Sequence, residues 1–268
     1  MSMPDPADVL VSCLMVALPS AGRLAFLERS IAAYAAQTHA SRELVIVLDQ
    51  GSAEDKAAIA KHVATLRRDD VRIVESPRAM SLGALRNLSR DSARGEVQCQ
   101  WDDDDLHHPQ RIELELAALA ASGAQAVCLQ ECMLLLAASS ELYWTNWRAT
   151  EPTVMPGTLM CRATAPIRYP ETGPRSQLIE DTDVVLQLLR AGGLHPIVDA
   201  PHLYVYVGHA SNTWGTAFHP MLASRLGLSR GLLLRREARL RENLRAIDFG
   251  PGPVNVRGPN GVAFTLGA

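Results

Sequence analysis

The chain has 268 residues, of which 47% are hydrophobic and 21% are charged, and its formal net charge is −3. This composition is that of a soluble globular protein that can bury a sizeable core, in one large domain or two small ones. The weakly negative charge gives no electrostatic basis for nucleic-acid binding, so we expect no nucleic-acid partner.

The cysteine pattern and the termini bear on the compartment. The five cysteines lack paired CxxC spacing, and they are Cys13, Cys99, Cys128, Cys132 and Cys161. Their odd number and apolar surroundings predict reduced, buried thiols rather than a disulfide framework or a zinc site. Residues 1–8 lack the features of a signal peptide, and no segment reaches the roughly 20 apolar residues of a membrane span. The sequence therefore predicts a cytoplasmic protein.

Apolar runs alternate with helical patterns along the first hundred residues. Strands are predicted over 9–18, 43–48, 71–74 and 96–101, and helices over 24–37, 53–67 and 82–94. Ser81 and Gly95 stand where the N-cap and the C-cap of the third helix are expected. Two strand–helix units in a row predict an α/β protein with a parallel sheet.

Four consecutive carboxylates, from Asp102 to Asp105, follow the strand predicted over 96–101, and Pro109 opens a helical pattern just beyond them. Adjacent like charges repel by about 1 kcal/mol per pair in water, and by several times that where water is scarce. The run therefore needs compensation, and Mg²⁺ or Mn²⁺ suits such oxygen ligands. Ligands of open α/β sheets bind at this end of the strands. A solvated acidic turn is the alternative.

Beyond the acidic run, strands are predicted over 125–136, 142–146, 157–161 and 203–207, and a helix over 178–191. The adjacent His107 and His108 are either metal ligands or part of a surface turn. The aromatic side chains of Tyr143, Trp144 and Trp147 form either a sugar platform or part of the core, and core is the commoner role.

A second acidic cluster enters the helix predicted over 178–191. At roughly 100° per residue, its apolar arc is formed by Val184, Val185, Leu188 and Leu189. Asp181 projects from near the centre of this arc, Glu180 lies near its edge, and Asp183 lies almost opposite. A carboxylate aimed at the packed side needs a function or a partner, and the functional interpretation makes Asp181 a general base. Alternatively, these acids complement the positive helix N-terminus.

These motifs, with several shorter ones, resemble the family 2 glycosyltransferases of GT-A fold. The matching segments are residues 11–15, 36–38, 43–52, 83–87, 93–96, 102–105, 180–181 and 209–214. Their order and spacing match the family over about residues 9–214. The resemblance implies a Rossmann-like α/β fold with a mixed central sheet flanked by helices. It also implies inverting, metal-dependent transfer of a sugar from a nucleoside diphosphate sugar to an acceptor hydroxyl.

The resemblance further implies roles for single residues. The Asp-x-Asp motif of the family holds the ribose and the metal bound to the diphosphate, and it matches Asp102 and Asp104. Asp104 is then the direct ligand of Mn²⁺ or Mg²⁺, while Asp103 and Asp105 are second choices because the fourfold run permits a register error. His209 matches a histidine that lies near the metal or the diphosphate in relatives, and an ordinary partly buried histidine is the alternative.

The Glu-Asp motif of the family matches Glu180 and Asp181 and supplies the general base from its Asp, in agreement with the helical arc. The nucleotide sugar is expected to contact Asp49, Gln50, Arg86, Asp102 and Asp103. The acceptor hydroxyl belongs to a glycan, a lipid-linked molecule or a small molecule. A nucleotidyltransferase of similar fold and a catalytically inactive relative that binds sugar nucleotides are the alternative functions.

Two stretches depart from the pattern of the family. Many members have two acids before the Gly-Ser turn, but here Asp49 is followed by Gln50, which leaves the nucleotide base open. The usual Thr-Tyr-Asn after the first strand is replaced by residues 18–23, whose Arg23 either binds phosphate or faces solvent. The Gln/Arg-x-x-Arg-Trp signature of processive synthases is missing, so we expect the addition of single sugars.

The expected organisation is a flexible start over residues 1–8, a glycosyltransferase domain over 9–218, and a C-terminal helix and tail over 219–268 that pack on this domain. Within the domain, the nucleotide-binding half covers about 9–105 and the acceptor half about 106–218. The last segment carries an apolar stripe flanked by arginines, formed by Leu233, Leu240, Leu244 and Ile247. This stripe either covers the core of the protein, or contacts a membrane surface, a partner or a second copy of the chain.

Overall fold

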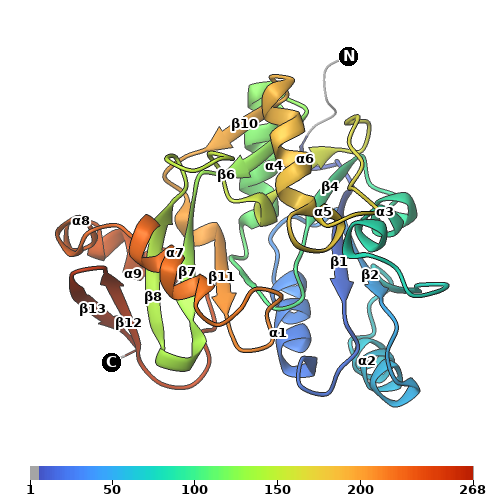
Figure 1. The fold of residues 1–268 in the computed structure, drawn as a ribbon, viewed down its shortest axis with the longest axis horizontal. Helices are drawn as coiled ribbons and strands as arrows, with labels where there is room; N and C mark the ends of the chain where they lie inside the picture. Colours follow the sequence, from blue (N-terminus) through green and yellow to red (C-terminus); the bar gives the residue numbers. More distant parts are fainter. Residues whose placement is uncertain (1–5, 268) are drawn as a thin grey trace.

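The computed structural model describes residues 6–267, which form two β-sheets with helices packed around them (Figure 1). The first sheet has seven strands and the second has six. The flexible start expected over residues 1–8 falls mostly on residues outside this description. The mixed α/β architecture implied by the resemblance is confirmed.

The first four strands in the sequence are parallel and belong to the first sheet: β1 (Val11–Ala17), β2 (Arg42–Leu48), β3 (Val71–Glu75) and β4 (Val97–Gln100). They lie in the order β3-β2-β1-β4, so the strand order reverses between β1 and β4. Parallel strands covered on both faces read as continuous apolar runs, and β1 and β2 have this composition. The parallel sheet predicted from the alternation of strands and helices is confirmed.

Three helices, α1 (Leu24–Ala35), α2 (Ala53–Thr65) and α3 (Leu82–Ser92), connect these strands. The Ser52 and Ser81 hydroxyls cap α2 and α3 by accepting the third backbone N–H beyond them, at 3.0 and 3.2 Å. Such caps satisfy N–H groups of the first turn that have no partner within the helix. The serines therefore fix where these helices begin, close to the carboxyl ends of β2 and β3.

Three further strands make the first sheet mixed: β6 (Ala126–Leu129), β9 (Met160–Arg162) and β10 (Leu194–Ile197). Strand β9 is antiparallel to both β4 and β6, and β10 is parallel to β6. Helix α4 (Arg111–Ser122) precedes β6, and α5 (Arg175–Leu178) and α6 (Glu180–Arg190) precede β10. The helix predicted over 178–191 corresponds to α6.

The second sheet contains β5 (Leu106–His107), β7 (Glu131–Leu136), β8 (Glu141–Asn146), β11 (Tyr204–Gly208), β12 (Val254–Gly258) and β13 (Gly261–Leu266). Their order is β13-β12-β8-β7-β11-β5, and β7, β8 and β11 lie to the left of β1 and β2 in Figure 1. The single strand expected over 125–136 is wrong, because the chain leaves the first sheet after β6 and enters the second at β7. Both pieces are mostly apolar and buried, and the short polar break at Gln130 and Glu131 does not by itself show that the chain changes sheet.

The C-terminal segment builds part of the second sheet. It contains α7 (Phe218–Leu226), α8 (Arg230–Arg235) and α9 (Glu237–Leu244), followed by the β12–β13 hairpin. The segment after these helices, expected to be a tail, is a hairpin whose β12 pairs with β8. The apolar stripe of residues 233–247 packs against Val254, Val256 and Phe264, which confirms that it covers the core of the protein.

Several side chains whose roles the sequence left open belong to the core. His107 lies 3.8 Å from the Trp101 ring and 2.7 Å from the Arg111 guanidinium, and His108 is also buried, so neither faces solvent. Tyr143 and Trp144 are buried as well. All five cysteines are free and buried, as predicted. Within residues 6–267, no helix combines the length and apolarity that a membrane span requires.

Candidate active site

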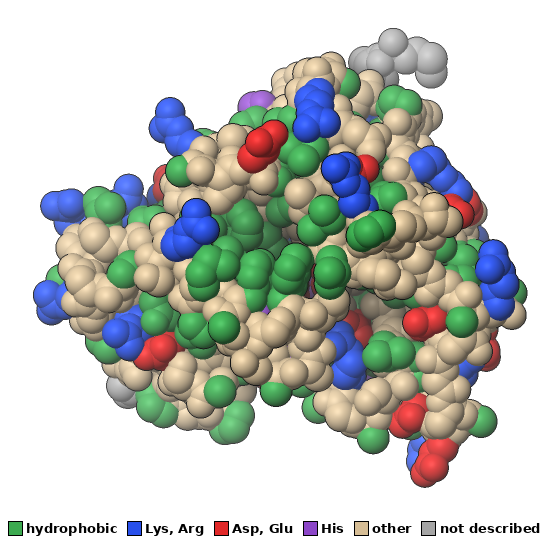
Figure 2. Space-filling view, viewed as in Figure 1, with side chains coloured by type: hydrophobic (Ala, Val, Ile, Leu, Met, Phe, Trp, Pro, Cys, Tyr) green, Lys and Arg blue, Asp and Glu red, His purple; other side chains and the backbone are tan. Residues whose placement is uncertain are grey.

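A pocket of about 530 Å³ lies between the two sheets. The first sheet contributes residues at the carboxyl ends of its parallel strands, including Leu18 after β1, Asp49 after β2 and Asp102 after β4. The second sheet contributes Tyr204 and Tyr206 of β11. Figure 2 shows the surface hollowed near the centre of this face, with hydrophobic side chains along the opening. This is the reversal point between β1 and β4, where open α/β sheets bind ligands.

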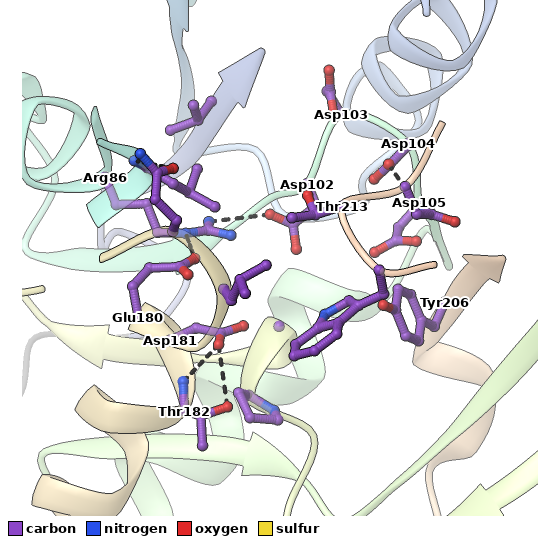
Figure 3. Close-up of a pocket in the computed structure, with 18 of the residues that line it drawn as sticks. Arg86, Asp102, Asp103, Asp104, Asp105, Glu180, Asp181, Thr182, Tyr206 and Thr213 are labelled. Carbon is purple, nitrogen blue, oxygen red and sulfur yellow. Dashed lines mark hydrogen bonds and ion pairs between the residues drawn. The ribbon is translucent and has the colours of Figure 1, made fainter. Parts of the chain in front are cut away.

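Arg86 joins the two acidic clusters on one side of the pocket. Its Nε donates to Glu180 Oε1 at 2.7 Å, and its Nη1 donates to Asp102 Oδ1 at 3.1 Å (Figure 3). Arg86 and Glu180 are 8% and 2% exposed, so this ion pair is shielded from water. Glu180, expected beside the base, thus has Arg86 as its partner, and Arg86 in turn orients Asp102.

Asp102 is held on this side by two further groups. The Gln100 amide donates to Asp102 Oδ2 at 3.1 Å, and the Tyr204 hydroxyl lies 3.4 Å from the same oxygen. The carboxylate therefore faces Arg86 rather than Asp104 and His209, with which it was expected to bind a metal. Adjacent residues leaving a strand point in different directions, which accounts for this separation.

Asp104 is the centre of a second group of contacts. Its Oδ2 lies 2.9 Å from Arg23 Nη2, 3.0 Å from His209 Nε2 and 3.2 Å from Asn212 Nδ2. Burial opposes its ionisation, but the hydrogen bond from His209 and the charge of Arg23 together lower the pKa of Asp104. The His209 ring is stacked on Phe26, with 4.2 Å between centroids. The expected proximity of Asp104 and His209 is therefore present.

The other two carboxylates of the run have different surroundings. Arg23 Nη2 donates to Asp103 Oδ1 at 2.6 Å, while burial and the Asp104 charge raise the pKa of Asp103 to about 7. Asp105 accepts hydrogen bonds from the Tyr204 hydroxyl and, at 2.7 Å, from the Val207 N–H. Burial, followed by the charge of Asp104, raises the pKa of Asp105 well above its usual range. Asp105 thus ties the acidic run to β11.

A divalent cation fits one part of this arrangement. Within residues 6–267, no group of three or more His, Cys, Asp or Glu side chains is placed to hold a metal, so the structure does not bring Asp102 together with Asp104 and His209. Asp104 and His209 nevertheless offer an oxygen and a nitrogen side by side. Mg²⁺ is often held by one or two carboxylates together with substrate phosphates and water, so this pair suffices for such a site.

Asp181 lies across the pocket from Asp104 in Figure 3. Its Oδ1 accepts hydrogen bonds from the N–H and the hydroxyl of Thr182, at 2.6 and 3.3 Å. Burial, followed by the charge of Glu180, raises the pKa of Asp181 to about 7. Asp183 instead pairs with Arg175 at 2.6 Å and accepts from Gln187 at 2.9 Å, outside the pocket. The helical arc therefore separated the two acids correctly.

The two residues after β2, Asp49 and Gln50, also point to different surroundings. Asp49 lines the pocket beside Leu18 and Met80, as expected of a residue that contacts the donor. Gln50 is not one of the lining residues, because its amide donates to the carbonyl and the hydroxyl of Ser76, at 3.0 and 2.9 Å. Gln50 is therefore not among the residues that the structure brings to the pocket, and its contact with the nucleotide base stays a prediction.

Sequence reasoning left Arg23 undecided and missed several pocket residues. Arg23 faces the pocket: besides its two carboxylate partners, its Nη1 donates to the Ser211 carbonyl at 3.0 Å. It thereby joins the loops that follow β1, β4 and β11. The missed lining residues include Glu151, Met155, Tyr204, Tyr206 and Phe218. Alternation along β11 was the available signal for Tyr206, since Val205 and Val207 face the core.

Comparison with known proteins agrees with this geometry. Residues 15–131 match the family described as Glycosyl transferase family 2. TarS of S. aureus, residues 1–349 in complex with UDP, superimposes with a TM-score of 0.57 at 12% identity, over 87% of this chain and 73% of that one. The mannosyltransferase PcManGT from Pyrobaculum calidifontis, in complex with GDP-Man and Mn²⁺, gives 0.57 at 16% identity, over 91% and 71%. At such identities the likeness shows the fold. No curated protein matches the sequence.

Proposed function

We propose that the protein is a glycosyltransferase like those of family 2, which its match over residues 15–131 and its fold support, and that it uses a nucleoside diphosphate sugar and an acceptor hydroxyl, with inversion at the anomeric carbon. The observation that carries this proposal is the placement of Asp181 across one pocket from Asp104 and His209. One side of the pocket then receives the acceptor, and the other receives the diphosphate of the donor.

Asp181 acts as the general base. It takes the proton of the acceptor hydroxyl while the acceptor oxygen bonds the anomeric carbon. The bond from that carbon to the diphosphate oxygen breaks, and its electron pair leaves with the nucleoside diphosphate. Inversion follows because the oxygen attacks from the face opposite the leaving group. A base with a pKa near the working pH is efficient, and the pKa of Asp181 is about 7.

Arg86 positions both halves of this machinery. It is buried between Glu180, next to the base, and Asp102, on the donor side. Because a buried charge that loses its partner costs several kcal/mol, the three groups keep one arrangement. The spacing between the base and the donor thus depends on this ion-pair network.

Asp104 and His209 would hold a divalent cation, which would offset the charge that develops on the departing diphosphate. The charge of the lining residues supports this role. Eight carboxylates and two guanidinium groups line the pocket, and both guanidinium groups, of Arg23 and Arg86, are already paired with carboxylates. Burial raises the pKa of three of these acids, Asp103, Asp105 and Asp181, but the remaining five still outnumber the two guanidinium groups. A diphosphate would meet mainly like charge there unless a cation came with it.

A screen of nucleoside diphosphate sugars, scoring release of the nucleoside diphosphate with Mn²⁺, Mg²⁺ or a chelator, tests the proposal. We expect activity with one class of donor, its loss on chelation, and its recovery when the metal is restored. Asp104→Asn should remove most of the activity, and Asp69→Asn, an equal change of charge at an exposed position, should not. Undiminished sugar transfer by chelator-treated protein would contradict the metal dependence.

A further inference from the structure

We propose that the acceptor is an uncharged carbohydrate whose ring stacks on an aromatic wall formed by Trp147, Tyr206 and Trp214. This inference rests on the proposed sugar transfer and names the class of its second substrate. It is carried by the distribution of the aromatic side chains, the way each ring is fixed, and the charge of the pocket.

The tryptophans and tyrosines of the chain are few, and those that are accessible gather in this pocket. The sequence contains four tryptophans and five tyrosines. Trp101, Trp144 and four of the tyrosines are buried. The three tryptophans and tyrosines that remain are half-buried, and all three line the pocket: Trp147, Tyr206 and Trp214. An exposed aromatic ring is costly in water, so this concentration indicates a surface that a ligand covers.

Each ring of the aromatic wall is supported on its protein side. The Trp147 indole N–H donates to Thr145 Oγ1 at 3.3 Å, and the ring packs against the core cluster that contains Met155. The Tyr206 ring meets His219 edge-on, with 4.8 Å between centroids. Trp214 is stacked on Phe218 at 4.5 Å. Since all three are half-buried and line the pocket, each has accessible surface on the pocket side. Aromatic side chains held in this way bind with little loss of conformational entropy.

The groups around the aromatic wall suit the amphipathic shape of a sugar. A pyranose has C–H faces that are apolar and a rim of hydroxyl groups. The rings provide apolar surface for a C–H face, while carboxylates on the same pocket, among them Asp181 and Glu151, accept hydrogen bonds from hydroxyls. Polar groups placed beside an aromatic lining fix the orientation of a small ligand in a pocket.

The charge of the pocket lining further restricts the class of acceptor. Arg23 and Arg86 are the only cationic residues among those that line the pocket, and both are paired with carboxylates. A phosphate-bearing lipid, an acidic peptide or an acidic sugar would therefore meet repulsion from unpaired acids and find no free guanidinium group. The acceptor that fits is uncharged.

The test compares acceptors and variants with the donor and metal found in the screen. The acceptor panel contains methyl glycosides and disaccharides of neutral hexoses, a sugar phosphate, a serine peptide and a long-chain alcohol. We expect transfer to neutral carbohydrates only. Trp214→Leu should raise the acceptor KM about fivefold to tenfold. Trp214→Phe should retain most of the affinity for the acceptor, because a phenyl ring can still stack on the sugar. Phe249→Leu, outside this pocket, should change neither value.

Direct binding gives a second measurement. Trp147 and Trp214 are the tryptophans that line the pocket, so a methyl glycoside, which does not absorb, should change the tryptophan fluorescence of protein saturated with nucleoside diphosphate and Mn²⁺. If no donor releases nucleoside diphosphate, the proposed function fails. If donors turn over but a charged or aliphatic acceptor is preferred, or Trp214→Leu leaves the acceptor KM unchanged, only the carbohydrate inference is overturned.

Discussion

Asp181 and Asp183 lie two residues apart in the same helical turn, yet their surroundings differ entirely. Asp181 lines the pocket with a raised pKa, and Asp183 pairs with Arg175 on the outer side of α6. Helical geometry alone produces this difference, because residues two apart face opposite directions. The two positions therefore form a matched pair for testing the general base.

Asp181→Asn should lower kcat by about 10²- to 10⁴-fold with little change in donor affinity, because a base acts in the transition state rather than in donor binding. Steady-state kinetics measures the change in kcat, and the affinity of the protein for the nucleoside diphosphate shows whether donor binding is retained. Asp183→Asn should be nearly silent, since it removes only a partly exposed ion pair. Equal losses at the two positions would refute the role of Asp181.

The pH profile follows from the same side chain. A general base works when ionised, so kcat/KM should rise with pH up to the pKa of Asp181, about 7, and level off above it. Below that value the rate should fall about tenfold per pH unit. The measurement is kcat/KM between about pH 5.5 and 8.5 at constant Mn²⁺. A profile that stays flat on the acidic side would show that another group accepts the proton.

Arg23 neutralises the same carboxylates that a cation would meet. Its guanidinium lies 2.6 and 2.9 Å from Asp103 and Asp104. Arg23→Gln should leave those acids without compensation and tighten Mn²⁺ binding to the donor-free protein about fivefold or more, since roughly 1 kcal/mol of like-charge repulsion is removed. Calorimetric titration with Mn²⁺ measures this, with exposed Arg78→Gln as the control. Weaker Mn²⁺ binding would mean that Arg23 helps to build the site.

At the scale of elements, α3 reaches the pocket because Gly83 has no side chain. A Cβ on Gly83 would lie 2.0 Å from the Pro170 carbonyl oxygen. The close approach places Arg86, one turn further along α3, within reach of Asp102 and Glu180. The contact between α3 and the segment around Pro170 therefore sets the geometry of the ion-pair network.

Gly83→Ala should force α3 away from Pro170 and destabilise the protein by about 1 to 3 kcal/mol, the usual cost of overpacking. The matched control is Gly231→Ala in α8, where a Cβ meets nothing within 4 Å. That change should be neutral or stabilising by up to about 1 kcal/mol, because alanine favours the helix. Denaturant unfolding of both variants gives the comparison, and similar stabilities would contradict the packing argument.

At the scale of the whole molecule, the two sheets depend on each other at the pocket. Asp105, which follows β4, is bonded to Tyr204 and Val207 of β11. The second sheet in turn is completed by the β12–β13 hairpin, more than a hundred residues after β8. The last residues of the chain thus support the second sheet. This sheet carries Tyr206 on β11, and Trp147 directly follows its strand β8.

Phe264→Ala tests this dependence. Phe264 is 7% exposed and packs with the cluster of Leu240 and Val256. Its truncation should cost about 3 to 5 kcal/mol of unfolding free energy, the range found for buried aromatic residues. Val262→Ala in the same strand, at a side chain that is 43% exposed, should cost no more than about 0.5 kcal/mol. Equal thermal midpoints for the two variants would show that the hairpin is dispensable.

The features that the sequence determined by itself are local or directional. Strand–helix alternation places the ends of parallel strands at one edge, so Asp49 and the acidic run were correctly expected to meet there. Helical periodicity likewise separates Asp181 from Asp183 without any knowledge of their neighbours. Such patterns depend only on backbone geometry, which a few consecutive residues establish.

Only the tertiary structure decided which groups each side chain contacts. Asp102 turns to Arg86 rather than to Asp104, and Gln50 turns to Ser76 rather than to the pocket. The chain also crosses between sheets at Gln130, where only Gln130 and Glu131 interrupt the apolar run, and β12 near its end pairs with β8. These outcomes depend on groups far apart in the sequence, such as Arg86 and Glu180, whose ion pair exists only after the chain has folded.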